Sequence, residues 1–218
     1  MIISEHLVGE IFLDLSLLLY LFLYPPQVYR NFRYHKVREL SFGFHTLIII
    51  ASTTDLYYAF GRILQWQYCA ASVLTFICLL IQHFQWLLHA DKTRYKLLNW
   101  WLLSVLIGLL LVGVFIVLYI HPKSLLIFII AGWIERLCGW TYTVPQIIKN
   151  IRQHSAASIS PIYASVAVIT IILDTTAAWI FHWGSPSLYG TPISLAMHTW
   201  LLLQCFLIKK KLKNNKIA

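Results

Sequence analysis

Long apolar segments separated by short polar connections run through almost the whole chain. Seven of them are each about as long as the 20 or so residues that a helix needs to cross a bilayer. They lie at about residues 7–30, 41–60, 67–88, 97–120, 124–148, 159–181 and 188–208. The first contains Glu10 and Asp14 and has no basic region or small-residue cleavage site before it, so we expect a retained helix rather than a signal peptide. The pattern predicts an all-α integral membrane protein with seven transmembrane helices.

The composition excludes water as the main solvent of this chain. Of its 218 residues, 59% are hydrophobic and only 11% are charged, and the mean hydropathy is +0.71. In a typical soluble domain about a quarter of the residues are charged. Seven spans and their connections use nearly all of this length, so we expect no soluble domain beside them.

Lys and Arg residues are distributed unevenly among the connections. Of the 17 in the chain, all but Arg62, Lys123 and Arg136 lie in the first, third and fifth connections or in the C-terminal tail. Because cytoplasmic loops hold an excess of basic residues, the N-terminus is predicted to be outside or lumenal and the C-terminus cytoplasmic. Topology and contact with anionic membrane lipids therefore explain the net charge of +9, and we expect no nucleic-acid partner.

The chemically reactive residues give no sign of an enzyme. The four cysteines fall within spans and form no CxxC pair, and the histidines of the spans, including His198, show no metal-ligand spacing. The sequence also lacks a recognisable nucleophile with its base and a glycine-rich phosphate-binding loop. We therefore expect no catalytic residue, no metal and no cofactor.

A stretch near the start of the chain recurs 119 positions later. YPPQVYRNFRYH at 24–35 aligns without a gap with TVPQIIKNIRQH at 143–154. The same offset pairs further polar residues, namely Ser41 with Ser160, Asp55 with Asp174, and Gln85 with Gln204. Because polar residues are scarce in this chain, so many matches in one register indicate an internal repeat.

The repeat determines the architecture that we expect. Each unit covers three helices, and the second unit has the same direction as the first only if a single helix lies between them. This gives a 3+1+3 arrangement with a pseudo-twofold axis along the membrane normal and a solute path between the repeats. The predicted divisions are a first repeat at 1–92, a linker helix at 93–123, a second repeat at 124–211 and a basic cytoplasmic tail at 212–218.

The dipeptides Pro26-Gln27 and Pro145-Gln146 resemble the paired motifs of the PQ-loop family, each at the cytoplasmic end of the first helix of a repeat. That family includes cystinosin, the lysosomal cationic amino-acid exporters and the related SWEET sugar carriers. The resemblance implies alternating-access transport of amino acids or sugars, often proton-driven in the amino-acid branch. It also implies a bacterial inner membrane or a lysosome-like organelle membrane, and the lack of any Asn-x-Ser/Thr sequon favours the bacterial one.

The two motifs also have a physical interpretation of their own. Proline inside a helix removes a backbone donor and clashes with the preceding turn, so we expect a bend at Pro26 and at Pro145. The side chains of Gln27 and Gln146 offer donors that can satisfy the freed carbonyl groups or reach a neighbouring helix. A bend at the same place in both repeats favours a hinge or gate, and static kinks are the alternative.

Three carboxylates within spans are candidates for proton coupling. Asp55 lies about fourteen residues into the second helix, roughly 20 Å from its start, and Asp174 lies at the matching depth of the sixth. Charged groups inside a membrane are costly and often mark proton or substrate paths. We expect Asp14, in the first helix, to lie near the depth of Asp55 and to form a carboxylate pair with it. A structural hydrogen bond to a neighbouring helix is the alternative role for each.

Glu135 and Arg136 in the fifth helix are candidates for substrate binding, with Trp133 and Trp140 as cavity walls. Since consecutive helical residues point about 100° apart, we expect the two charges to have different partners. Arg136 is expected to neutralise Asp174 or hold a substrate carboxylate, and Glu135 to take a proton or a substrate amine. A salt-bridge network between the fifth and sixth helices is the alternative.

Gln85 and Gln204, toward the cytoplasmic ends of the third and seventh helices, are further candidates for substrate binding or an inner gate. Contact with the surface or with lipid headgroups is the alternative for both.

Three functions remain open from the sequence. A proton-coupled transporter of a cationic or cystine-like amino acid suits the buried acids and the buried arginine. A SWEET-like facilitative carrier of neutral sugar would not need paired aspartates. A receptor resembling the KDEL receptor would bind its cargo without transporting it.

Overall fold

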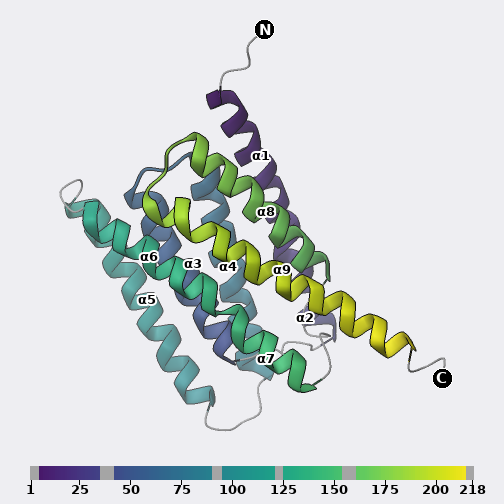
Figure 1. Ribbon diagram of the computed structural model, residues 1–218. Helices are drawn as coiled ribbons and strands as arrows, with labels where there is room; N and C mark the ends of the chain where they lie inside the picture. The colour runs from purple at the N-terminus through teal and green to yellow at the C-terminus, as the bar shows by residue number, and fades with distance from the viewer. Residues whose placement is uncertain (1–4, 35–41, 90–94, 121–124, 154–160, 215–218) are drawn as a thin grey trace.

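The computed structural model describes residues 5–34, 42–89, 95–120, 125–153 and 161–214, and every regular element within these ranges is an α-helix (Figure 1). The helices are α1 (Glu5–Leu23), α2 (Pro25–Tyr34), α3 (Phe42–Gly61), α4 (Trp66–His89), α5 (Tyr95–Ile120), α6 (Leu125–Thr141), α7 (Thr143–Gln153), α8 (Pro161–Ile180) and α9 (Ser185–Asn214). Because α1 and α2, and likewise α6 and α7, are halves of one broken span, the described residues form seven spans. This confirms the predicted all-α 3+1+3 fold class.

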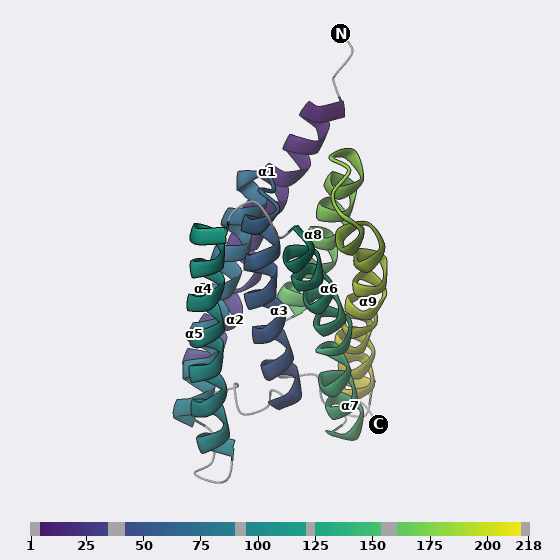
Figure 2. The same ribbon diagram turned by 90° about the vertical axis from the view of Figure 1, so that its left-hand side faces the viewer.

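Two groups of helices make up the bundle, and we call α1–α4 the first triplet and α6–α9 the second triplet. The largest contacts between them are α3 with α6 and α1 with α8, two pairings that correspond to each other in the sequence repeat. The connecting helix α5 packs outside against α3, where the ring of Tyr57 covers Gly113. Figure 2 shows α5 on the opposite side of the bundle from α9.

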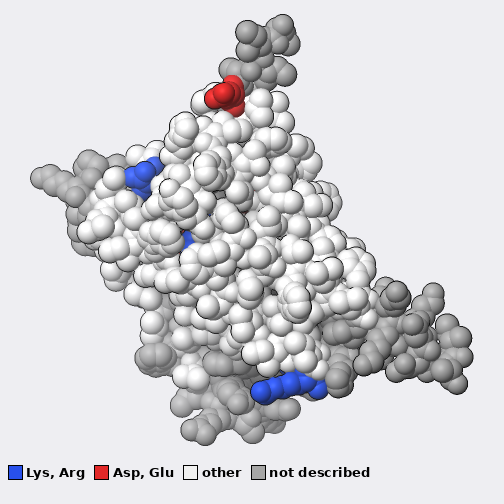
Figure 3. All heavy atoms as spheres, viewed as in Figure 1, with Lys and Arg blue, Asp and Glu red and all other residues white. Residues whose placement is uncertain are grey.

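The outer surface suits a bilayer. Within the part of the chain that the structure describes, four segments are long and apolar enough to cross a membrane, namely Glu5–Arg33, Trp66–Gln85, Leu125–Arg152 and Pro161–Ile180. On the face shown in Figure 3, charged residues gather near the two ends and the surface between them is almost wholly uncharged. The start of α1 and the end of α9 lie at opposite ends of the bundle (Figure 1), as an odd number of crossings requires.

Each span with a PQ motif is broken beside its proline. The first break falls at Tyr24, between α1 and α2, and the second at Tyr142, between α6 and α7. Pro26 lies in the first turn of α2 and Pro145 in the first turn of α7, where a missing backbone donor costs least. The bends predicted from the sequence are therefore present in both triplets. We call the end of the bundle that holds these motifs the PQ end.

At the opposite end, the turns from α3 to α4 and from α8 to α9 share one backbone conformation. Ile63 and His182, which are 119 positions apart, have φ angles of 52° and 51°. In both turns an amide donates across to a carbonyl five residues earlier at 3.0 Å, from Leu64 to Ala59 and from Trp183 to Ala178. This is the Schellman ending of a helix, which usually has glycine at the left-handed position. Neither residue is glycine, so the surrounding packing holds a costly conformation twice. The repeat thus extends from side chains to backbone.

Candidate functional site

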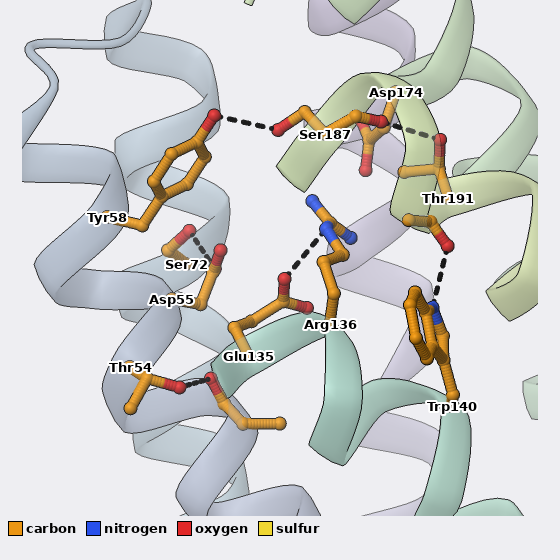
Figure 4. A network of polar contacts seen from close by, with 12 residues as sticks. Thr54, Asp55, Tyr58, Ser72, Glu135, Arg136, Trp140, Asp174, Ser187 and Thr191 are labelled. Atoms are coloured by element: carbon orange, nitrogen blue, oxygen red, sulfur yellow. Dashed lines mark hydrogen bonds and ion pairs between the residues drawn. The ribbon is translucent and has the colours of Figure 1, made fainter. Parts of the chain in front are cut away.

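A cavity of about 120 Å³ lies between the two triplets. Its walls come from α1, α3 and α4 on one side and from α6, α8 and α9 on the other. Four of the residues selected from the sequence line it, namely Asp55, Glu135, Arg136 and Asp174. In Figure 4, Glu135 and Arg136 project from α6 between the two aspartates. The fold therefore brings together charged groups that are far apart in the sequence.

Asp174 on α8 is bound from the facing helix of the other triplet. Its carboxylate accepts hydrogen bonds from Ser16 Oγ at 2.5 Å and from Tyr20 Oη at 3.0 Å, both on α1. The residue is only 8% exposed. Hydroxyl donors of this kind offset part of the cost of burying a charge. Asp174 therefore links the two triplets.

Asp55 on α3 is bound within its own triplet. It accepts hydrogen bonds from Tyr68 Oη at 2.7 Å and from Ser72 Oγ at 2.5 Å, both on α4. The Tyr68 hydroxyl also lies 3.5 Å from Nη2 of Arg136. Tyr68 thus connects Asp55 to the charged residues of α6.

The expectation that Glu135 and Arg136 have different partners is wrong. Nε of Arg136 lies 2.8 Å from Oε2 of Glu135, and the two side chains are 10% and 13% exposed. Their Cβ atoms diverge, but both side chains are long enough to turn toward each other. In a buried site with few other charges, the neighbouring opposite charge is the nearest compensation. Among the described residues Arg136 forms no ion pair with Asp174, and it acts on that carboxylate only by attraction over a longer distance.

Gln27 and Gln146 are fully buried and make the same hydrogen bond in the two triplets. Nε2 of Gln27 donates to Oδ1 of Asn31 at 3.0 Å, and Nε2 of Gln146 donates to Oδ1 of Asn150 at 2.8 Å. In each case the partner lies one turn further along the same helix. The PQ motif thus forms a polar cluster on the inner face of α2 and of α7.

Gln85 and Gln204 hold the PQ helices in place. Nε2 of Gln85 donates to the backbone oxygen of Val28 in α2 at 3.0 Å, and Nε2 of Gln204 donates to that of Ile147 in α7 at 3.4 Å. Both glutamines are buried, with 8% and 7% exposure, so contact with the surface or with headgroups is ruled out. Neither lines the cavity.

A chain of three tyrosines and a histidine closes the PQ end of the cavity, and we call it the tyrosine latch. The Tyr163 hydroxyl shares hydrogen bonds with Tyr24 and Tyr142, and the ring of Tyr24 meets that of Tyr163 edge to face at 5.7 Å. The Tyr142 hydroxyl bonds to Nε2 of His198, whose Nδ1 lies 2.8 Å from the Ser194 carbonyl oxygen. A carbonyl only accepts, so Nδ1 carries a proton and Nε2 of the neutral ring accepts from Tyr142. The Tyr24–Tyr163 contact joins the two triplets, and Tyr24 and Tyr142 mark the two helix breaks.

The opposite end of the cavity is closed by contacts between the two turns. Trp183 donates from Nε1 to Oε1 of Gln65 at 2.7 Å and packs edge to face on Tyr68 at 4.7 Å. Ser187 donates to the Tyr58 hydroxyl at 3.1 Å (Figure 4). All of these contacts cross between the triplets, so the cavity is bounded by inter-triplet contacts at both ends.

Three further residues selected from the sequence, besides the glutamines, lie away from the cavity. Asp14 is exposed on α1 and accepts a hydrogen bond from Gln67 at 3.0 Å, so the expected pair with Asp55 is not formed. Trp140 donates to the Gly190 carbonyl in α9 at 2.8 Å, and Trp133 packs edge to face on it at 6.5 Å. The two tryptophans support the contact between α6 and α9 and do not line the cavity.

The sequence did not identify the hydroxyl donors. Ser16 and Tyr20 on α1, and Tyr68 and Ser72 on α4, are pairs four residues apart and therefore lie on one helix face. That spacing, opposite an aspartate in a neighbouring span, is a signal by which such donors can be found. Among the described residues, no group of three or more His, Cys, Asp or Glu side chains could hold a metal ion.

These features define a seven-span membrane protein with a polar cavity between two related triplets, and comparison with known proteins shows what this chain is similar to. The family profile described as the PQ loop repeat matches residues 8–68. The structure of a eukaryotic SWEET transporter matches with a TM-score of 0.68 at 10% identity, over 94% of this chain and 99% of that chain. No curated protein sequence matches. The PQ loop repeat match over residues 8–68 and the SWEET-like fold support the resemblance to PQ-loop membrane transporters that the sequence suggested.

Proposed function

We propose that this protein is an alternating-access transporter of a small polar solute, coupled to protons, whose cargo is a cationic or cystine-like amino acid. The observation that carries the proposal is the cavity between the triplets, in which three carboxylates face one guanidinium group. Burying these groups within a membrane is costly, and such residues commonly mark ion or substrate paths. The excess of acids suits a cargo that brings positive charge, or a proton.

Each group has a role in this proposal. Glu135 and Arg136 bind the charged groups of the cargo, and Asp55 and Asp174 carry the proton. Pro26, Gln27, Pro145 and Gln146 form the hinges about which the PQ helices move. Gln85 and Gln204 act from outside the cavity by holding the PQ helices in place, and Trp133 and Trp140 do so by supporting the contact between α6 and α9. Asp14 has no part because it lies on the exposed face of α1.

Uptake into liposomes tests the proposal. Purified protein in vesicles with an acidic exterior is expected to accumulate radiolabelled L-lysine or L-cystine above the outside concentration. Collapse of the pH gradient with a protonophore should abolish accumulation while exchange of labelled for unlabelled cargo continues. Vesicles without protein are the control, and accumulation that survives the protonophore contradicts proton coupling.

A facilitative sugar carrier is the second candidate, because the matching solved structure is a SWEET transporter. Two results would favour the sugar carrier. Labelled glucose would equilibrate across the vesicle membrane at a rate that does not depend on pH, and Asp55→Asn and Asp174→Asn would transport normally at every pH. Binding of a ligand without flux would instead favour a cargo receptor.

We further propose that residues 1–92 and 124–211 are parallel repeats joined by the linker helix at 93–123, with the tail at 212–218 in the cytoplasm. The repeated turns, helix breaks and glutamine contacts support this division. The boundaries at 92/93 and 123/124 and most of the tail lie outside the described residues, and the boundary at 211/212 falls within α9. The proposed orientation has the N-terminus outside or lumenal, in a bacterial inner membrane or a lysosome-like organelle membrane. Protease access to a tag at each terminus tests it, and equal access from one side contradicts it.

A further inference from the structure

The internal repeat allows the surroundings of the two aspartates to be compared position by position. The positions of Ser16 and Tyr20, which bind Asp174, correspond in the second triplet to Glu135 and Gly139 on α6. α6 packs on α3, which carries Asp55, as α1 packs on α8. A glycine therefore occupies the place equivalent to the tyrosine that fills the other half of the cavity.

The space beside Gly139 is open on the cavity side. A Cβ atom there would meet Oε1 of Glu135 at 3.6 Å and Oγ of Ser194 at 3.7 Å, which are ordinary contact distances. Gly139, Glu135 and Ser194 all line the cavity. The missing tyrosine ring thus leaves a polar corner with a carboxylate oxygen on one side and a hydroxyl on the other.

The carboxylate of Glu135 is only partly used by the protein. Its Oε2 atom faces Arg136 at 2.8 Å, whereas no hydrogen bond to Oε1 occurs among the described residues. A carboxylate has about four acceptor sites, so this oxygen can accept from a ligand while the ion pair with Arg136 is kept. The Ser194 hydroxyl supplies a second acceptor for a group with several N–H donors.

We propose that the corner formed by Glu135 Oε1, Gly139 and Ser194 Oγ is the subsite for an ammonium group of the cargo, and that Gly139 sets the size of the group admitted there. The inference rests on the proposed transport function and deepens it by assigning the end of the cargo that enters the second triplet. An ammonium ion has three donors and a positive charge, which match the oxygen acceptors and the excess of acids. The Cα atom of Gly139 is the floor of the subsite, so any side chain added there takes space from the cargo.

Binding to the purified full-length protein tests this assignment. L-Lysine, ethylammonium and D-glucose would be titrated separately against the wild type, Gly139→Ala, Gly139→Val and Glu135→Gln, by calorimetry at one pH. Glu135→Gln is expected to weaken lysine and ethylammonium about tenfold or more, because a charge-assisted hydrogen bond is lost. Gly139→Val is expected to weaken the binding of lysine by a similar factor and the binding of ethylammonium by much less. The effects of Gly139→Ala are expected to lie between those of the wild type and Gly139→Val.

Gly108→Val is the matched control, because a Cβ atom added to Gly108 on α5 would meet nothing within 4 Å and this residue does not line the cavity. It should leave all affinities unchanged, and thermal unfolding without ligand shows whether each variant is folded. If a variant does not fold, Gly139→Ala still decides, because the contacts at 3.6 and 3.7 Å can accept a methyl group.

The possible outcomes separate this subsite from the transport function. Wild-type affinity for lysine in both Gly139→Val and Glu135→Gln would overturn the subsite while leaving transport intact. A wild type that binds glucose but no amine would overturn the subsite and favour the sugar carrier. Flux in liposomes, measured independently, decides whether the protein transports at all.

Discussion

Asp55 and Asp174 occupy equivalent positions of the repeat, yet one is hydrogen-bonded within its own triplet and the other across to the facing triplet. Asp174 is bound by α1 across the boundary between the triplets, whereas Asp55 is bound by α4 within its own triplet. Motion of one triplet against the other must therefore break the contacts of Asp174 and can leave those of Asp55 intact. The comparison shows that two carboxylates at equivalent positions of the repeat differ in whether their hydrogen bonds depend on how the triplets are placed.

The largest expected effect concerns that charged pair, which only the Asp55 side possesses. Arg136→Met keeps the aliphatic stem and removes the charge, leaving Glu135 and Asp55 uncompensated, and should destabilise the fold by about 3 to 5 kcal/mol. Thermal and denaturant unfolding in detergent measure the loss. The double variant Glu135→Gln/Arg136→Met should recover a large part of it, and additive losses would contradict the pairing.

The second prediction separates the two aspartates by transport. Asp174→Asn cannot release a proton when the triplets move, so we expect accumulation driven by a pH gradient to fall about tenfold or more while exchange continues. Asp55→Asn should lower proton-driven accumulation as well and, in addition, weaken cargo binding in both assays, because it alters the network that reaches Arg136 through Tyr68. Identical profiles for the two variants would show that the difference in hydrogen bonding has no functional meaning.

The third prediction concerns the tyrosine latch at the PQ end. Tyr24→Phe removes one hydrogen bond between the triplets, worth about 1 kcal/mol, and should raise the ratio of open to closed protein about fivefold. Spin labels at Arg33→Cys in α2 and Arg152→Cys in α7, with the four native cysteines replaced by alanine, report the distance between the PQ helices. Tyr189→Phe, on the exposed face of α9, is the control. An unchanged distance distribution in Tyr24→Phe would show that the latch does not hold the PQ end closed.

The smallest effect is expected at Asp14, the third carboxylate that the sequence suggested for proton coupling. Asp14 is exposed and accepts a hydrogen bond from Gln67, which the amide oxygen of asparagine can also accept. Asp14→Asn should therefore change proton-driven uptake by less than about twofold. If Asp14→Asn lowered proton-driven uptake as much as Asp174→Asn does, Asp14 would be part of the proton path after all.

The sequence predicted the fold because the number of spans and the internal repeat can both be recognised from short stretches of the chain. Apolar length marks each span, and the register that pairs Asp55 with Asp174 survives in the polar residues. The repeat even predicted that Gln85 and Gln204 behave alike, and both indeed contact the backbone of a PQ helix.

The contacts inside the site depend on features that no local pattern contains. The Glu135–Arg136 pair requires two side chains to turn from diverging directions, which is decided by what else the cavity offers. The latch joins Tyr24 to Tyr163, and their meeting depends on the rotation and tilt of helices from different triplets. Asp14 was misplaced for the same reason, because depth along a helix does not say which neighbour its face meets.

The packing of α5 on α3 determines where the chain can be divided. Rocking of the two halves would carry α5 along with the N-terminal part, so the molecule separates mechanically into bodies of four and three spans. A chain cut between Ile120 and Leu125 should reassemble from co-expressed fragments into a working carrier. A cut before α5 would instead leave that helix covalently attached to the second triplet, although it packs on α3 of the first triplet.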